Sequence, residues 1–303
     1  MRDMTLGVDL SDVVTRLVVV DEDGEVRSRG EVAPPAAQSA AAIRDAARRA
    51  IAGAGGTIAG CAVALAASGE EVPGKIAAAL VEAGAGRSNS DITPIAAGTA
   101  AALAEQWCGG ARGFTQVVTF AIGEHVTAGL LLNGEPWHGA HGFASSVGWL
   151  AMNPVEREDY RRLGGLEAEI GAAGIVRRFV WRIKSGDESA VADQAGGDFS
   201  KISVADILNG ARSGDGVSIS VIRDTAKYVG MAVANLATAF DPEVVVLGGV
   251  IAQSGDQLLD VIRTECARRL RPQQAEVVKV VLSPLGHEAV AIGAARAAAR
   301  VGA

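Results

Sequence analysis

Cysteine is scarce in this sequence of 303 residues, and the three that occur, Cys61, Cys108 and Cys266, stand far apart. Such isolated cysteines exclude both a disulfide framework and a zinc site built from closely spaced thiolates. Basic residues are also few, because 28 lysines and arginines are outnumbered by 35 acidic residues, which gives a net charge of −7. Nucleic-acid binding needs a basic surface, so no direct nucleic-acid partner is expected.

Long apolar runs are missing as well. A membrane-spanning helix needs about 20 predominantly apolar residues, whereas the run Val244–Leu247 is soon broken by Gly248-Gly249. The residues Met1-Arg2-Asp3-Met4 lead directly into an expected strand, so no signal peptide is expected. These features predict a cytoplasmic protein with reduced thiols and no membrane partner.

The residues that are present have a soluble, globular balance, 49% hydrophobic and 21% charged. The length suffices for two lobes, each with its own core. Strand-like and helix-like segments alternate, which predicts an α/β fold. The expected strands lie within 5–20, 59–66, 117–122, 126–132, 241–250 and 277–281, and the expected helices within 36–53, 75–84, 168–185, 204–210, 217–240, 258–270 and 288–301, with a strand running into a helix over 92–105 and a polar linker over 186–200.

The stretch from Gln116 to Trp149 is the part around which the chain is organised. A β-branched run over 117–122, a turn at Gly123-Glu124-His125 and a second run over 126–132 predict a pair of antiparallel strands. Asn133-Gly134 is a strong turn signal. The glycine-rich segment that follows allows the backbone to approach a ligand closely.

This stretch resembles the core of the ROK proteins (repressors, open reading frames and sugar kinases), and the likeness extends over nearly the whole chain. The resemblance implies an α/β, two-lobed actin-like ATPase (ribonuclease H-like) fold with an interdomain cleft. The smaller lobe is expected over 1–107, joined by the closing helix 288–303, and the larger lobe over 108–287.

Two phosphate-binding loops of that family are altered here. The first reads Asp-x-Gly-Gly-Thr in the family, and this chain keeps Asp9 but has Ser11-Asp12-Val13 in place of the last three residues. The second reads Gly-Thr-Gly, which here is Gly123-Glu124-His125. Asp12 is interpreted as part of an acidic turn at a solvent edge. The residues that the resemblance leaves as vestigial nucleotide-binding positions are Asp9, Gly123, Gly129, Gly248 and Gly249.

The catalytic positions are altered too. The family's general base, an Asp, aligns with Ala97, which cannot accept a proton, so no catalytic residue is expected. Asp91, Glu105 and Glu167 are the nearby candidates for a substitute carboxylate, and Glu105 is interpreted as a solvated helix residue. The family's Glu-x-Gly-His segment is Ser146-Val147-Gly148-Trp149, which leaves Gly148 and the later Glu167 as vestigial sugar-binding positions.

All four zinc ligands of the family are absent, since Trp149 replaces the His and 153–165 contains no cysteine. His138 and His141 are expected to be ordinary surface or hydrogen-bonded histidines. No metal site and no cofactor are therefore expected.

These differences favour a ROK-family protein that has lost kinase activity and binds a small sugar-like ligand or a protein partner, as a homodimer. One alternative is an active glucokinase-like enzyme with a rebuilt site, which alone would need ATP and Mg²⁺. A second alternative is a ROK-type transcriptional regulator that lacks its helix-turn-helix domain.

Overall fold

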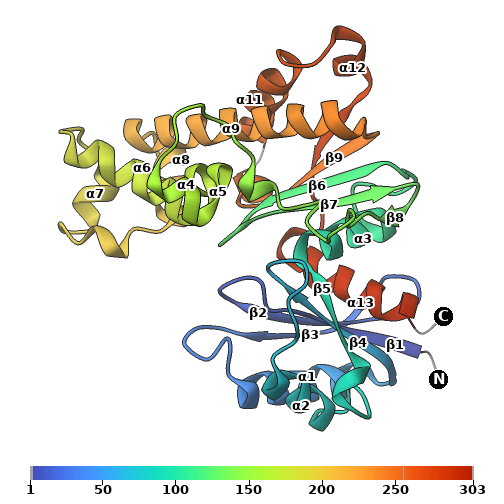
Figure 1. Ribbon diagram of the computed structural model, residues 1–303. Coiled ribbons are helices and arrows are strands. Elements are labelled where there is room, and N and C mark those ends of the chain that lie inside the picture. The colour runs from blue at the N-terminus through green and yellow to red at the C-terminus, as the bar shows by residue number, and fades with distance from the viewer. Residues whose placement is uncertain (1–2, 255, 302–303) are drawn as a thin grey trace.

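The computed structural model describes residues 3–254 and 256–301 as two lobes, each with a five-stranded sheet (Figure 1). The ends of the expected lobes at 1–2 and 302–303 lie outside the described residues, and the division at 107/108 stays a prediction. The first sheet contains β1 (Asp3–Asp9), β2 (Thr15–Val20), β3 (Val26–Val32), β4 (Thr57–Leu65) and β5 (Ile92–Ala96), and the second contains β6 (Val117–Ile122), β7 (Val126–Leu132), β8 (Glu135–Pro136), β9 (Val244–Gly249) and β10 (Lys279–Leu282).

Both sheets are built in the same way. In each, three consecutive strands form an antiparallel meander, and two later strands are added in parallel beside the first strand of that meander. The orders are β3-β2-β1-β4-β5 and β8-β7-β6-β9-β10. The chain therefore makes one sheet topology twice, which confirms the predicted α/β fold of two lobes.

The helices cover these sheets and fill the space between them. They are α1 (Ala40–Ala54), α2 (Gly74–Glu82), α3 (Ala97–Cys108), α4 (Glu158–Leu163), α5 (Gly165–Ile170), α6 (Ala172–Lys184), α7 (Ala190–Gln194), α8 (Val204–Arg212), α9 (Gly216–Phe240), α10 (Val250–Ser254), α11 (Asp256–Ala267), α12 (Pro272–Val277) and α13 (Ala289–Val301). Among the described residues, no helix is both long enough and apolar enough to cross a membrane.

The parallel strand pairs decide where the loops gather. In the first sheet Asp9 pairs with Ala64 at the carboxyl ends of β1 and β4. In the second, Ile122 pairs with Gly249 at the carboxyl ends of β6 and β9. Ligands of open α/β sheets bind outside the carboxyl ends of the strands. The loops after β1, β6 and β9 accordingly lie at one cleft.

Helices α3 and α13 lie between the two sheets (Figure 1). A Cβ added to Gly98 of α3 would lie 1.8 Å from the carbonyl oxygen of Ala128 in β7. Where the two helices cross, a Cβ on Gly293 of α13 would lie 1.6 Å from the carbonyl oxygen of Ala100. Glycine is thus required at both positions, because backbone packs directly against backbone. The lobes are joined through this close crossing.

Several expected boundaries were wrong. The helix expected over 168–185 is broken at Gly171, which has the extended dihedrals φ −59° and ψ 162° and separates α5 from α6. The polar linker expected over 186–200 contains α7, capped by the hydroxyl of Ser189. The helix expected over 258–270 ends at Ala267, and α12 follows it with Pro272 in its first turn.

Candidate functional site

A cleft between the lobes is lined by loops from both sheets. The first lobe contributes Asp9, Ser11 and Asp12, and the loop between β6 and β7 contributes Gly123, Glu124 and His125. Gly248 and Gly249 line it from the end of β9. The cavity in this cleft measures about 90 Å³ and is partly open to solvent. Loops from both lobes therefore share one site.

The loop after β1 satisfies its own hydrogen-bond donors. The carboxylate of Asp9 accepts from the backbone N–H of Ser11 at 2.8 Å and from the Ser11 hydroxyl at 2.6 Å. The carboxylate of Asp12 accepts from the N–H of Val13 at 2.8 Å and pairs with Arg16 at 3.1 Å. Asp12 lies in the turn between β1 and β2 and is partly exposed at the cleft, which is compatible with an acidic turn at a solvent edge. The Arg16 guanidinium holds its side chain beside the loop.

Asp9 is a deeply buried acid of the cleft, with 3% of its surface exposed. Burial raises the pKa of Asp9 to about 6, against the opposing effect of the Ser11 hydrogen bonds. Arg16 pairs directly with Asp12 and acts on Asp9 through space, where it lowers the pKa of Asp9 less than the Ser11 hydrogen bonds do. The site thus carries a carboxylate that is costly to ionise.

The loop between β6 and β7 is closed by a second acid. The N–H of Gly123 bonds to the carbonyl of His125 at 3.0 Å, which makes the turn. The N–H of Val126 donates to Glu167 Oε2 at 2.6 Å, and His125 Nδ1 lies 3.4 Å from Glu167 Oε1. The hydrogen bond with Glu167 raises the pKa of His125. Glu167, expected from the resemblance to hold a sugar, therefore holds the loop and its imidazole.

Replacing Glu167 with Gln is expected to lower the pKa of His125, because the carboxylate is the main group that stabilises the imidazolium. The amide oxygen of Gln keeps an acceptor for the N–H of Val126, so the loop should be retained. Proton NMR titration of the histidine resonances measures the shift. Glu124→Gln is the control and should change the pKa of His125 less. An unchanged titration in Glu167→Gln would show that the pair does not form in solution.

The glycines expected at the vestigial sites have three different surroundings. Gly249 has φ +63°, and a Cβ there would lie 2.0 Å from the carbonyl oxygen of Ile122, so a glycine is needed at the cleft. Gly129 lies within β7, where a Cβ would be 2.0 Å from the carbonyl oxygen of Gly98, and this position packs the α3 backbone. Gly148 lies beside Glu167, whose Oε2 would be 3.1 Å from an added Cβ.

Of the carboxylates proposed from the sequence as substitute bases, only Glu105 is among the residues described at the cleft. Ala97 is buried at the start of α3, with 1% exposure. Asp91 caps a short turn by accepting from the N–H groups of Arg87 and Ser88, and it is not among the residues described at the cleft.

Glu105 was predicted to be solvated, and this was wrong, because it is 1% exposed. It belongs to α3, which has a sheet on one side and α13 on the other. Its carboxylate accepts from the hydroxyl of Ser283 and from the N–H of Gly110 at 2.7 Å. Burial raises its pKa. Glu105 therefore ties the end of α3 to the loop after β10.

Histidine and cysteine side chains do not form a metal centre within 3–254 and 256–301, where no three potential ligands gather. His138 and His141 are exposed, in agreement with the prediction of surface histidines. The role of His125 was missed, and only its place in a turn was visible in the sequence. The contact with Glu167 spans 42 positions and depends on tertiary packing.

Comparisons with known proteins find the ROK family over most of the chain. A model of the ROK family matches residues 87–301. The glucokinase of Halalkalibacterium halodurans is 31% identical over 198 residues, which cover 64% of this chain and 59% of that protein. The glucokinase of Streptomyces coelicolor is 28% identical over 96% of both chains.

A solved structure extends the likeness to the fold. The ROK family glucokinase from Streptomyces griseus, in complex with glucose and AMPPNP, has a TM-score of 0.79 and 26% identity, and the match covers 98% of this chain and 99% of that one. The two-lobed architecture predicted from the resemblance is confirmed by this match over both lobes.

Proposed function

Because the chain belongs to the ROK family, we propose that it is a member that no longer phosphorylates sugars and that binds a small sugar-like ligand in its cleft as a regulatory protein. We place it in the cytoplasm, acting as a homodimer. Its glucokinase relatives use the same fold, so the cleft is the place where a ligand is expected.

One observation carries the proposal. In the loop after β1 and in the loop between β6 and β7, backbone N–H groups already donate to carboxylates of the chain itself. A phosphate is held in such loops by backbone N–H groups that face it. Here the N–H groups of Ser11, Val13 and Val126 already donate to Asp9, Asp12 and Glu167. A triphosphate would have to displace three carboxylates and would meet their negative charge.

The missing base supports the same conclusion. A general base contributes about 10²–10⁴-fold to a reaction of this class, and Ala97 supplies none. Exposed rings remain near the altered segment, with Trp137, Phe143 and Trp149 exposed by 40%, 70% and 59%.

A second candidate, an active sugar kinase, is favoured by the pairing of His125 with Glu167 at the cleft. A histidine oriented by a carboxylate is a usual arrangement for a general base. In that case Nδ1 of His125 would donate to Glu167 and Nε2 would take the proton of the sugar hydroxyl. ATP and Mg²⁺ would then be needed.

The test is to measure unfolding of the protein with Mg-ATP, and separately with sugars and sugar phosphates. We expect no stabilisation by Mg-ATP, and stabilisation by at least one sugar or sugar phosphate. A ligand at one hundred times its dissociation constant adds about 2.7 kcal/mol to the free energy of unfolding, which is readily measured.

A coupled assay for ADP with glucose and Mg-ATP accompanies the unfolding measurements, with a ROK glucokinase as the positive control. Stabilisation by Mg-ATP together with formation of a sugar phosphate would overturn the proposal. His125→Asn would then decide whether His125 is the base, since turnover should fall at least tenfold. Stabilisation by none of the compounds would favour a protein partner in place of a small ligand.

A further inference from the structure

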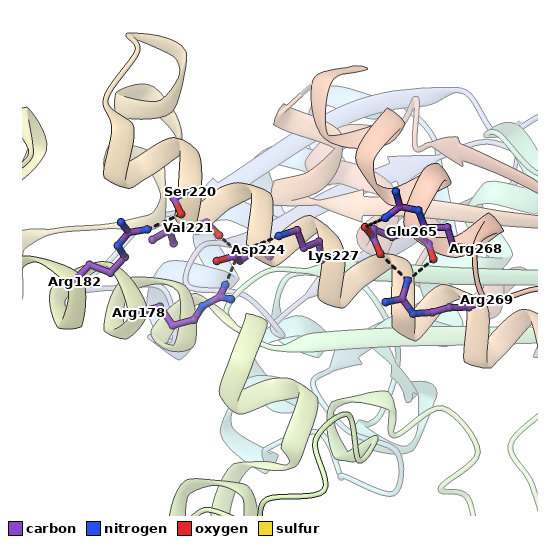
Figure 2. Close-up of polar contacts among 10 residues, drawn as sticks. Arg178, Arg182, Ser220, Val221, Asp224, Lys227, Glu265, Arg268 and Arg269 are labelled. Carbon is purple, nitrogen blue, oxygen red and sulfur yellow. Dashed lines mark hydrogen bonds and ion pairs between the residues drawn. The ribbon is translucent and has the colours of Figure 1, made fainter. Parts of the chain in front are cut away.

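A second cavity lies in the larger lobe, between α6 and α9. It encloses about 710 Å³, which is within the roughly 300–1,000 Å³ of ligand pockets. Its walls carry Arg178 and Trp181 from α6, and Asp224, Lys227 and Tyr228 from α9. Figure 2 shows Arg178 reaching from α6 toward α9. None of these residues belongs to the cleft described above.

Most charges around this cavity are paired. Arg157 lies 3.3 Å from Glu169, and Lys227 lies 3.0 Å from Asp224. Arg177 pairs with Asp159 and donates to the carbonyl of Ala168 at 2.6 Å. These pairs leave the charge of Arg178 as the unbalanced one.

Arg178 has no carboxylate within 4.0 Å among the described residues. One terminal nitrogen donates to the hydroxyl of Thr225, and the guanidinium lies 5.6 Å from the ring centre of Tyr228. Its Nε is buried and has no hydrogen-bond partner in the described part of the chain. Burial lowers the pKa of Arg178. Glu169 and Asp224 act on Arg178 only through space, so this partly buried guanidinium lacks a direct counter-ion, which an anion would supply.

The neighbouring arginine shows what is missing. Arg182 lies one helical turn further along α6 and also reaches α9, where it donates to the hydroxyl of Ser220 (Figure 2). Unlike Arg178, it has a carboxylate partner, Asp187, at 2.6 Å. The two residues share a helix and a mode of packing, and they differ in the counter-charge.

We propose that this cavity binds a small organic anion, with a phosphate or carboxylate group on Arg178 and a ring against Trp181. The planar guanidinium suits the oxygens of either group. Trp181 is 69% exposed, although large aromatic residues are usually covered. Tyr228 and Met231 supply further apolar wall. A ligand of this kind would supply the missing counter-charge and cover the exposed ring.

The test uses calorimetric titration of the full chain with phenyl phosphate, benzoate and inorganic phosphate. We expect saturable binding of at least one of the two ring compounds, and weaker binding of inorganic phosphate because it lacks the ring. A preference between phenyl phosphate and benzoate would identify the anionic group.

Matched variants assign the binding to this cavity. Arg178→Met keeps an unbranched apolar stem and should weaken binding at least tenfold, with no loss of folded protein, since it removes a partly buried charge that has no direct ion pair. Trp181→Ala, at an exposed position, should weaken the binding of the two ring compounds at least threefold. Arg182→Met is the control and should leave binding unchanged.

Absence of saturable binding for all three compounds would overturn the proposal. An equal loss in Arg182→Met and Arg178→Met would also overturn it, because the binding would then follow the general charge of α6. Sedimentation of the variants tests whether a second copy of the chain occupies this surface instead. A monomer produced by Trp181→Ala, with no change in anion binding, would identify the surface as a contact between two copies and would contradict the proposal.

Discussion

Gly293→Ala is expected to lower the free energy of unfolding by about 3 kcal/mol, the upper end of the usual cost of overpacking. The added Cβ would lie 1.6 Å from the carbonyl oxygen and 2.2 Å from the carbonyl carbon of Ala100. Both are backbone atoms of α3, so no side chain can rotate away. The helices α3 and α13 would have to separate, and the joint between the lobes would open with them. Urea unfolding followed by circular dichroism measures the change.

Gly216→Ala provides the matched control. Gly216 begins α9, and an added Cβ there meets no heavy atom within 4 Å. Alanine favours helix over glycine by up to about 1 kcal/mol, so this variant should be neutral or slightly more stable. Equal stability of Gly293→Ala and the unsubstituted protein would show that α3 and α13 do not cross as closely as described.

Asp9→Asn is expected to stabilise the protein by about 3 kcal/mol at pH 8, and hardly at all at pH 4. Burial raises the pKa of Asp9 from 3.8 to about 6 in the folded state, and each unit corresponds to about 1.4 kcal/mol. The folded state therefore binds this proton more tightly than the unfolded state. The stability that the protonated carboxyl contributes is present below about pH 4 and is lost as the pH rises through 6. Asparagine avoids the cost and still offers an oxygen to the N–H of Ser11.

Asp21→Asn is the control, and it is expected to change the stability in the opposite direction. Asp21 is also buried, but hydrogen bonds from Arg27, Glu25 and Asp23 outweigh burial and lower its pKa. Asparagine there should destabilise the protein at neutral pH, where the carboxylate is ionised. Urea unfolding at several pH values measures both variants. A constant difference between Asp9→Asn and the unsubstituted protein from pH 4 to pH 8 would contradict the raised pKa.

The higher stability expected of Asp9→Asn also has a consequence for function. Ionised groups are rarely buried without a partner unless a site needs them. Removal of Asp9 should therefore combine higher stability with weaker ligand binding, as in other sites where stability is given up for activity.

The sequence was most informative where a local pattern determines the structure. The β-branched runs at 117–122 and 244–247 became the central strands β6 and β9, which are buried on both faces. The long amphipathic pattern at 217–240 became α9 within one residue. Phe120 and Leu247 are fully buried. Such patterns suffice because apolar burial is the main driving force of folding.

Features that depend on contacts between residues far apart in the sequence could not be predicted as well. Glu105 has the sequence setting of an exposed helix residue, and only the packing of α3 between a sheet and α13 buries it. The interaction of His125 with Glu167 and that of Glu105 with Ser283 join segments far apart in the chain. Arg178 is one of three arginines in α6, and its lack of a counter-charge is visible only in three dimensions. Local sequence carries no record of these contacts.

The position of α13 has a consequence for the order in which the protein is made. Ala291 and Ala295 of α13 cover Gly7 of β1, and Ala298 covers Gly60 of β4. The strands of the first sheet therefore leave the ribosome early. More than two hundred further residues must be synthesised before α13 can cover one face of that sheet. During synthesis the second lobe can form around β6 and α9 while β1 and β4 remain exposed on that side. Chaperone binding to the nascent chain is accordingly expected at the earliest part of the protein and not at the latest.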